Sequence, residues 1–246
     1  MSNVEERERQ RYALLWGGQQ VGSRGRKPSL KLRKIVKAGL SIADKEGLSE
    51  VSMNRVAKKV GLAVMGLYRY IPSKDALIDL MVESVLGEIP YPDPAPRGWR
   101  ARLAVSAYRE WQMYGRHPWV LQAVSTTRLP MGPNMVRDLN WMLESVEELS
   151  DEAETRLWLT MLLMAYVQGA GLVLISEREA ARKKDSSIKE FWDAKMPALG
   201  KGAEGFGASA VVRLFSKMTR PVDLDTWFEF GLQRTLDGIK EFAAHK

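Results

Sequence analysis

Apolar residues recur at helical spacing along most of the chain. The clearest stripe has the i, i+3, i+4, i+7 spacing of one buried helix face: Met53, Val56, Ala57 and Val60. Gly61 interrupts it, and a second short helix is predicted over about 63–71, with Leu67 and Ile71 inward, before Pro72. Two short helices joined by a glycine turn indicate a helix-turn-helix, whose second helix can enter the major groove of DNA.

A longer helix is predicted on each side of this pair. Ser29 is a suitable N-cap for a helix over 29–46, and Ser73 for a helix that ends near Gly87. The first has a buried stripe made of Leu32, Ile35, Val36, Leu40 and Ala43. Its charged residues predict one exposed basic face that attracts phosphates: Lys31, Arg33, Lys34 and Lys37.

The prolines of 89–96 exclude a helix there, and this segment is the predicted domain boundary. Beyond it, the spacing predicts further helices over about 97–115, 116–124, 134–149, 150–176, 188–195 and 224–244, with a flexible glycine-rich loop over 200–207. The predicted fold class is therefore all-α, with an N-terminal three-helix DNA-binding domain over 29–88 and a C-terminal helical domain over 97–246.

Composition narrows the classes of function. The formal net charge of +7 favours polyanionic partners. The chain has no cysteine, and its two histidines, His117 and His245, are far apart, so we expect no disulfide, metal site, cofactor or histidine-based catalysis. No apolar run approaches the roughly 20 residues of a membrane span, and the N-terminus does not resemble a signal peptide. We expect a cytoplasmic, nucleoid-associated protein without membrane contact.

Residues 1–28 are polar and charged apart from an apolar cluster over 12–16. We expect a largely flexible basic arm, although a short helix around the cluster could dock on a neighbour. Arg24 and Arg26 flank Gly25, an arrangement that suits a narrow minor groove. The alternative is a solvated tail.

The stretch GLAVMGLYRYIPSKDALIDLM, residues 61–81, resembles the signature of the TetR family of bacterial transcriptional regulators. The similarity lies in the Gly61 turn, the Leu67-Tyr68 pair, the apolar Ile71 and the Ser73-Lys74 helix start. It extends more weakly into the second half, which resembles tetracycline-repressor-like members. The resemblance implies a homodimer that binds a double-stranded operator and a small effector, with two C-terminal helices per subunit forming a four-helix bundle at the dimer interface.

The resemblance also implies roles for individual residues. Ser52 would contact a phosphate as well as cap its helix, and Asn54 would contact a base. On the second helix, the groove-facing positions are Val64, Met65 and Gly66, and the positions that contact the DNA backbone are Tyr68, Tyr70 and Lys74. Three apolar groove-facing residues cannot read hydrogen-bond patterns, so we expect thymine methyl contacts, DNA shape and the arm to share in specificity.

In the second half, Thr127 and Arg128 match a Thr-Arg pair beside the effector pocket of the tetracycline-repressor-like members. Val124 stands where a magnesium-chelating histidine is expected, so a tetracycline–magnesium complex is a poor effector. Most methionines and aromatics at helical spacing are core residues, but some can line an adaptable apolar pocket. The candidate effector-binding residues are Trp111, Thr127, Arg128, Asn134, Met161, Tyr166 and Gln168.

The predicted function is a sequence-specific regulator, a repressor released from its operator by a small, largely apolar effector. One alternative keeps DNA binding and makes the pocket vestigial. Another is an all-helical enzyme acting on an apolar substrate, for which Asp223 and Asp225 are the nearest approach to a carboxylate pair. These two acids follow a proline as at an ordinary helix start, so we do not expect an enzyme.

Overall fold

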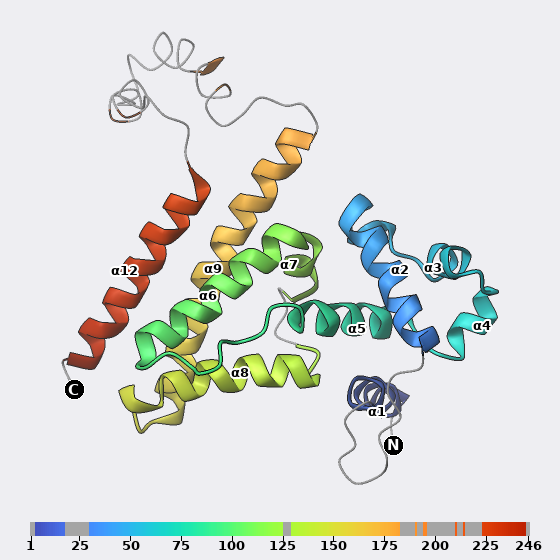
Figure 1. The fold of residues 1–246 in the computed structure, drawn as a ribbon, viewed down its shortest axis with the longest axis horizontal. Coiled ribbons are helices and arrows are strands. Elements are labelled where there is room, and N and C mark those ends of the chain that lie inside the picture. The colour runs from blue at the N-terminus through green and yellow to red at the C-terminus, as the bar shows by residue number, and fades with distance from the viewer. Residues whose placement is uncertain are drawn as a thin grey trace.

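A computed structural model describes residues 3–17, 30–124, 129–182, 190, 194–195, 210, 214 and 223–244. The predicted all-α class is confirmed, since the described residues form helices and turns without a β-strand (Figure 1). The α-helices are α1 (Asn3–Trp16), α2 (Leu30–Glu46), α3 (Met53–Val60), α4 (Val64–Tyr68), α5 (Lys74–Leu86), α6 (Trp99–Arg116), α7 (Trp119–Val124), α8 (Pro133–Ser145), α9 (Ala153–Arg182) and α12 (Leu224–Ala244). Two 3₁₀ turns, η1 (Leu48–Glu50) and η2 (Glu147–Leu149), follow α2 and α8.

We call α2, α3, α4 and the first half of α5 the head. Its core contains the residues that the sequence predicted to face inward, and the side chains of Val56, Leu67, Ile71 and Leu77 are fully buried. Ser73 caps α5 as predicted, because its Oγ accepts a hydrogen bond from the Ala76 amide at 3.1 Å.

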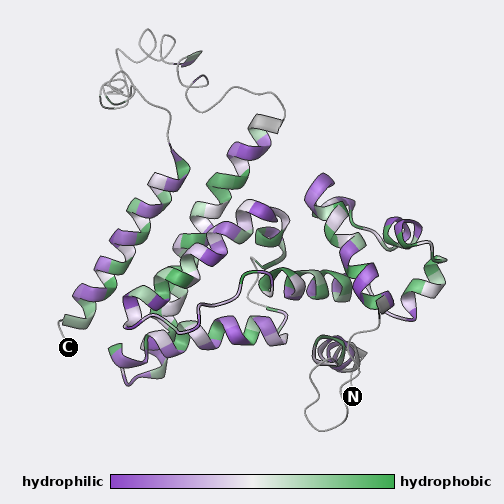
Figure 2. Ribbon diagram, viewed as in Figure 1, coloured by the Kyte–Doolittle hydropathy of each residue, from purple (hydrophilic) through white to green (hydrophobic). Residues whose placement is uncertain are grey.

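We call α6 to α9 and α12 the bundle. Helix α12 runs beside α9, and α6 crosses α9 on the side toward the head (Figure 1). The core between these helices is aromatic, since the Trp111 ring stacks on Phe228 with 4.3 Å between centroids and Tyr166 lies 5.8 Å from the same ring. Figure 2 shows hydrophobic residues concentrated on α5 and on the inward faces of these helices.

Helix α5 connects the head to the bundle and is clamped at two places. The buried Glu83 carboxylate accepts hydrogen bonds from the backbone amides of Asn134 and Met135 at the start of α8. At the end of α5 and just beyond it, the Arg109 guanidinium donates to the carbonyls of Leu86 at 3.2 Å and Ile89 at 2.5 Å. Burial raises the pKa of Glu83, and the α8 amides only partly offset that rise.

The expectation of a flexible arm is wrong for residues 3–16, which form helix α1. The physical reason is a docking contact far away in sequence: Arg11 pairs with the nearly buried Asp79 of α5 at 2.6 Å, and Trp16 Nε1 donates to the Met131 carbonyl at 2.8 Å. Burial raises the pKa of Asp79, which Arg11 opposes. Helix α1 therefore touches both the head and the segment that enters α8.

Several predicted helix limits need correction. Helix α4 covers five residues rather than the predicted 63–71, and α6 starts at Trp99 because Gly98 has a φ of +79°. Helix α8 ends at Ser145 and is followed by η2, whereas α9 continues beyond 176 to Arg182. The predicted loop at 200–207 and most of the predicted helix at 188–195 lie outside the described residues.

The statement that no apolar run approaches the length of a membrane span is also wrong. The segment 157–176 of α9 has no charged residue, and the described chain contains one helix long and apolar enough to cross a membrane, at Ala153–Ala180. Length and composition alone are weak evidence for a span, because core helices of soluble proteins pass the same test. Much of α9 packs on α6 and α12.

Candidate nucleic-acid interface

The reading unit consists of α3, a tight turn and α4. Ser52 caps α3, with its Oγ accepting from the Arg55 amide at 3.3 Å, as the sequence predicted. Gly61 ends α3 in the left-handed conformation at φ +72° and ψ +33°, which a residue with a Cβ adopts only with strain. The chain can therefore reverse direction within three residues before α4 begins.

Helix α4 presents an apolar outer surface. Met65 is 76% exposed, and a side chain added at Gly66 would meet no atom within 4 Å. Tyr68 is exposed, whereas Val64 and Tyr70 are half-buried against the head core. Met65 and Tyr68 are thus the most accessible of the predicted recognition residues on α4 and the turn after it, and the space beside Gly66 is open.

Positive charge is concentrated around this unit. Residues 30–74 contain ten Lys and Arg against three Asp and Glu, an excess equal to the net charge of the whole chain. Lys74, Lys58 and Arg69 are exposed and make no hydrogen bond, ion pair or ring contact within the described part of the chain. Arg69 follows α4 directly and was not among the predicted site residues, although its position beside Tyr68 gave the signal.

Not every cation here is available to DNA. Arg55 forms ion pairs with Glu46 at 2.6 Å and Glu50 at 2.7 Å, and this contact lowers the pKa of Glu46. Lys59 donates to Ser41 Oγ at 3.0 Å. These contacts fasten α3 to α2 and η1, so Arg55 and Lys59 support the reading unit. Asn54 is exposed on α3, where a base contact requires it.

The four cations predicted for the exposed face of the helix over 29–46 are all exposed on α2, but they spread over a wide arc and serve two different surfaces. Lys31 lies over the Tyr70 ring, 5.9 Å from its centroid, on the side of the reading unit. Arg33 and Lys37, one turn apart, line a groove against α1, α5 and α8. Residues 31 and 33 are about 160° apart around the helix, with residues 34 and 37 between them, so this spread follows from their positions in the sequence.

The structure brings only some predicted effector residues together. Trp111 and Tyr166 meet around Phe228, with Trp111 Nε1 donating to Asp225 at 2.7 Å and Tyr166 donating to the Phe228 carbonyl at 2.5 Å. Asn134 lies apart from them, with its side chain donating to the Glu83 carbonyl. Met161 is exposed and Gln168 half-buried on α9. The predicted residues outside the described part of the chain are Arg24, Arg26, Thr127 and Arg128.

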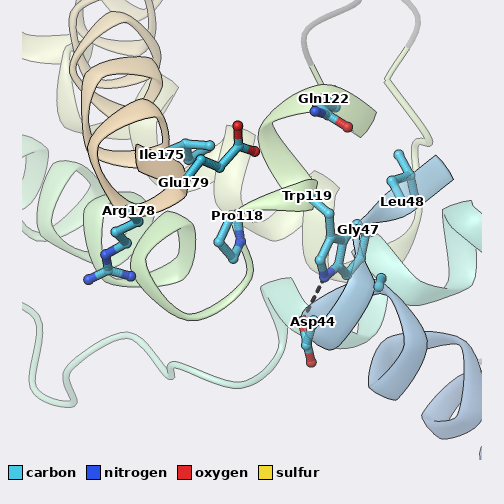
Figure 3. A pocket seen from close by; sticks show the side chains of 10 residues that line it. Asp44, Gly47, Leu48, Pro118, Trp119, Gln122, Ile175, Arg178 and Glu179 are labelled. Atoms are coloured by element: carbon cyan, nitrogen blue, oxygen red, sulfur yellow. Dashed lines mark hydrogen bonds between the residues drawn. The ribbon is translucent and has the colours of Figure 1, made fainter. Parts of the chain in front are cut away.

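The head and the bundle meet at a polar junction that sequence reasoning missed. Trp119 of α7 and Asp44 of α2 lie next to each other in the lining of a small cavity of about 60 Å³, as Figure 3 shows, and Trp119 Nε1 donates to Asp44 Oδ1 at 2.7 Å. Arg178 and Glu179 of α9 line the same cavity. This junction joins α2 of the head to α7 and α9 of the bundle.

The described residues contain no group of three or more histidines and acids placed to hold a metal ion. Asp223 and Asp225 act as structural acids. Asp223 accepts from the Thr226 amide at 3.1 Å as the cap of α12, and these Thr226 contacts lower the pKa of Asp223. Asp225 accepts a hydrogen bond from the indole N–H of Trp111. Neither arrangement is that of a carboxylate pair around a reacting atom.

Comparison with known protein families matches both halves of the chain. The model "Bacterial regulatory proteins, tetR family" matches residues 35–81, and the model "Tetracyclin repressor-like, C-terminal domain" matches residues 91–243. The HTH-type transcriptional repressor DrrR1 of Streptomyces coeruleorubidus is 37% identical over 236 residues, which cover 95% of this chain and 86% of DrrR1. An HTH-type transcriptional regulator of Saccharopolyspora erythraea is 31% identical over 108 residues, 44% of this chain and 45% of that protein.

Solved structures with the same fold include ActR of Streptomyces coelicolor. Its apo form has a TM-score of 0.70 at 24% identity, covering 90% of this chain and 99% of ActR. The complex of ActR with actinorhodin has a TM-score of 0.68, covering 86% of this chain and 95% of ActR. At this identity, the similarity establishes the fold.

Proposed function

The chain belongs to the TetR family of bacterial transcriptional regulators, and from this we propose that it is a homodimeric repressor. A small, largely apolar effector releases this repressor from its operator. The observation that carries DNA binding is the combination of a glycine-turned α3–α4 pair with three exposed, unpaired cations beside it. The name of DrrR1 supports repression.

In this proposal, α4 enters the major groove and α3 lies across its edge. Met65 and Val64 contact thymine methyl groups, Gly66 permits close backbone approach, and Asn54 pairs with a base from α3. Phosphates are contacted by residues that ring this surface: Ser52, Tyr68, Arg69, Tyr70 and Lys74. Arg24 and Arg26 extend the contact into the minor groove, a role argued from their sequence alone.

The dimer forms through α9 and α12. These helices carry large apolar side chains that the single chain leaves exposed, including Trp158 at 64% and Phe230 at 62%. Others on the same helices are Leu157, Met161, Leu162, Leu172, Trp227 and Phe242. An exposed apolar patch of this kind marks an interface, and a two-fold pairing of α9 and α12 buries it while separating two reading helices by about one turn of DNA, roughly 34 Å.

The effector acts on the bundle and, through α5, on the head. ActR has been solved with (S)-DNPA and with actinorhodin, which supports a ligand for this fold without identifying the ligand of this chain. Trp111 and Tyr166 are the described candidates that share one aromatic cluster. Because α5 is clamped to α6 and α8, a shift of either helix moves the head, and coupling of about 1–3 kcal/mol would suffice for release. A DNA-binding regulator of this kind acts in the cytoplasm.

Selection of bound sequences from random duplex DNA with the full-length protein tests the proposal. We expect a near-palindromic site whose affinity falls steeply as salt rises from 50 to 200 mM, since phosphate contacts release counterions. A Lys74→Ala variant should bind all duplexes more weakly, whereas Glu154→Ala, an exposed position on α9, should not. Absence of any enriched sequence at low salt would refute DNA reading. If no apolar compound released the protein from its operator, the result would favour a vestigial pocket.

A further inference from the structure

A large concavity lies between the head and the bundle, away from the reading helices. Its volume is about 500 Å³, within the range of small-molecule sites. Four helices supply its walls: α1, α2, α5 and the start of α8. The apolar part of the lining consists of Leu14, Leu15, Leu32, Val36, Leu80 and Pro133. We call this concavity the junction groove.

Two cations stand at the edge of this apolar lining. Arg33 and Lys37 are exposed, one helical turn apart on α2, and neither makes an ion pair, hydrogen bond or ring contact within the described part of the chain. Their positions turn them away from Lys31, which lies on the Tyr70 ring beside the reading unit. Arg33 and Lys37 therefore add positive charge to the groove rather than to the α3–α4 surface.

The one acid in the lining does not neutralise them. The Glu83 carboxylate is directed at the α8 amides of Asn134 and Met135, and its side chain is buried. Ser84 and Asn134 add polar atoms on the α5 and α8 side. The groove thus combines an apolar floor with unpaired positive charge on one wall, which complements a molecule with a ring body and an acidic group.

We propose that the junction groove binds an amphipathic organic anion, an aromatic or alicyclic body carrying a carboxylate or sulfonate, with the acid on Arg33 and Lys37 and the body on Leu15, Leu32 and Leu80. The inference rests on the proposed function in one respect: it gives the effector a chemical class and a second place to act. A ligand here touches α2 and α5 of the head and α8 of the bundle together, so it fixes the angle between them.

Two other occupants fit less well. The segment 18–29 of the same chain carries Arg24, Arg26 and Lys27 and no acid, so it has the same sign of charge as the wall. Duplex DNA has the right charge, but a groove bounded by α1 and α8 as well as α2 offers apolar side chains where a phosphate backbone needs polar ones.

The test uses two probes with nearly the same ring system, 8-anilinonaphthalene-1-sulfonate and its uncharged relative N-phenyl-1-naphthylamine, titrated by fluorescence into the full-length protein without DNA. The R33Q/K37Q variant should bind the sulfonate about tenfold more weakly than wild type. Its affinity for the uncharged probe should fall by less than about twofold. The control K31Q/K34Q removes the same charge from α2 outside the groove and should leave both affinities unchanged.

A second variant, Ser84→Phe, fills the groove from α5 and should weaken both probes. Circular dichroism confirms that each variant folds. Equal loss of sulfonate binding in the two double variants, or unchanged binding in Ser84→Phe, would overturn the proposed site. Because no DNA is present, either result leaves operator binding by α4 unaffected, and operator binding is measured separately.

Discussion

The Nδ1 atom of His117 lies 2.7 Å from Asp44 Oδ1, which joins the turn between α6 and α7 to the last turn of α2. The other ring nitrogen, Nε2, lies 3.0 Å from Glu88 Oε2 in the connection after α5. A neutral imidazole has one N–H, so only the doubly protonated ring can donate to both carboxylates. With the Trp119 indole on the same Asp44 oxygen, this contact connects three segments at the junction of head and bundle.

Replacing Asp44 with alanine should loosen this junction. It leaves the Trp119 N–H and one His117 nitrogen without their acceptor, so we expect the free energy of unfolding to fall by about 2 kcal/mol. Urea denaturation followed by tryptophan fluorescence measures it. The control Glu179→Ala changes an exposed acid on the same cavity and should alter stability by less than about 0.5 kcal/mol. Equal effects would mean that Asp44 is only a surface charge.

Arg109 and Arg137 provide a matched pair for testing the clamp on α5. Both contact Asp138 and the Leu86 carbonyl, but the Arg109 side chain is 10% exposed and that of Arg137 is 44% exposed. Burial already raises the pKa of Asp138, and Arg109→Met removes one of the two arginines that oppose this rise. We therefore expect Arg109→Met to lower the free energy of unfolding by about 3 kcal/mol. Arg137→Met should cost less than about 1 kcal/mol. Thermal unfolding measures both variants. Equal shifts of their midpoint temperatures would contradict the proposal that Arg109 clamps α5.

Glu110 of α6 gives a pH-dependent prediction. Burial of its carboxyl, reinforced by Asp138, raises the Glu110 pKa from 4.5 to about 7, although the Tyr114 hydroxyl opposes the shift. The folded protein therefore holds this proton more tightly than the unfolded chain, so the group reduces stability as the pH rises between about 4.5 and 7. Glu110→Gln should be more stable than wild type by about 3 kcal/mol at pH 8 and equal to it near pH 4.

Urea titrations at several pH values measure this difference. Glu154→Gln, which removes the same charge from an exposed position on α9, is the control and should not reproduce the pH dependence. A constant difference between Glu110→Gln and wild type from pH 4 to 8 would show that the pKa of Glu110 is the same in the folded protein as in the unfolded chain.

The features that the sequence predicts correctly are those set by the local pattern of residues. The predicted limits of α12 coincide with Leu224–Ala244, and the buried stripe of α3 and the Ser73 cap of α5 follow directly from spacing and residue type. Such features depend on residues within one or two helical turns of each other. The reading unit belongs to this class, which is why its geometry could be predicted.

Contacts between distant segments account for what was missed. Arg11 and Asp79 are 68 positions apart, and Asp44 and His117 are 73 apart, so neither the docking of α1 nor the polar junction leaves a local signal. The pairing of Arg55 with Glu46, which are nine positions apart, leaves no local signal either. The roles of individual residues in contacting DNA or effector remain predictions.

Substitution on α4 should separate base reading from phosphate contact. Val64→Gln introduces a hydrogen-bonding side chain where the native surface is apolar, so we expect the preferred operator to change, with a preference for adenine at one position per half-site. The companion variant Lys58→Gln should lower affinity for all sequences alike and reduce the salt dependence, without changing the preferred site. Selection from random DNA measures both. An unchanged site for Val64→Gln would mean that α4 does not read bases there.

The exposed apolar side chains of α9 and α12 predict how the oligomer should respond to a charge. Phe230→Arg places a cation in the centre of the surface proposed to pair, where an unpaired charge cannot be buried. Light scattering after size exclusion should give twice the mass of one chain for wild type and the mass of one chain for the variant at micromolar concentration. Trp158→Arg on α9 should act in the same way, because that side chain is equally exposed. Operator affinity should fall by about a hundredfold or more, since two half-sites are no longer held at a fixed spacing.

Asn140→Arg puts the same charge on the exposed side of α8 and should leave the mass and affinity unchanged. A Phe230→Arg protein that stays dimeric and retains its operator would place the subunit interface elsewhere.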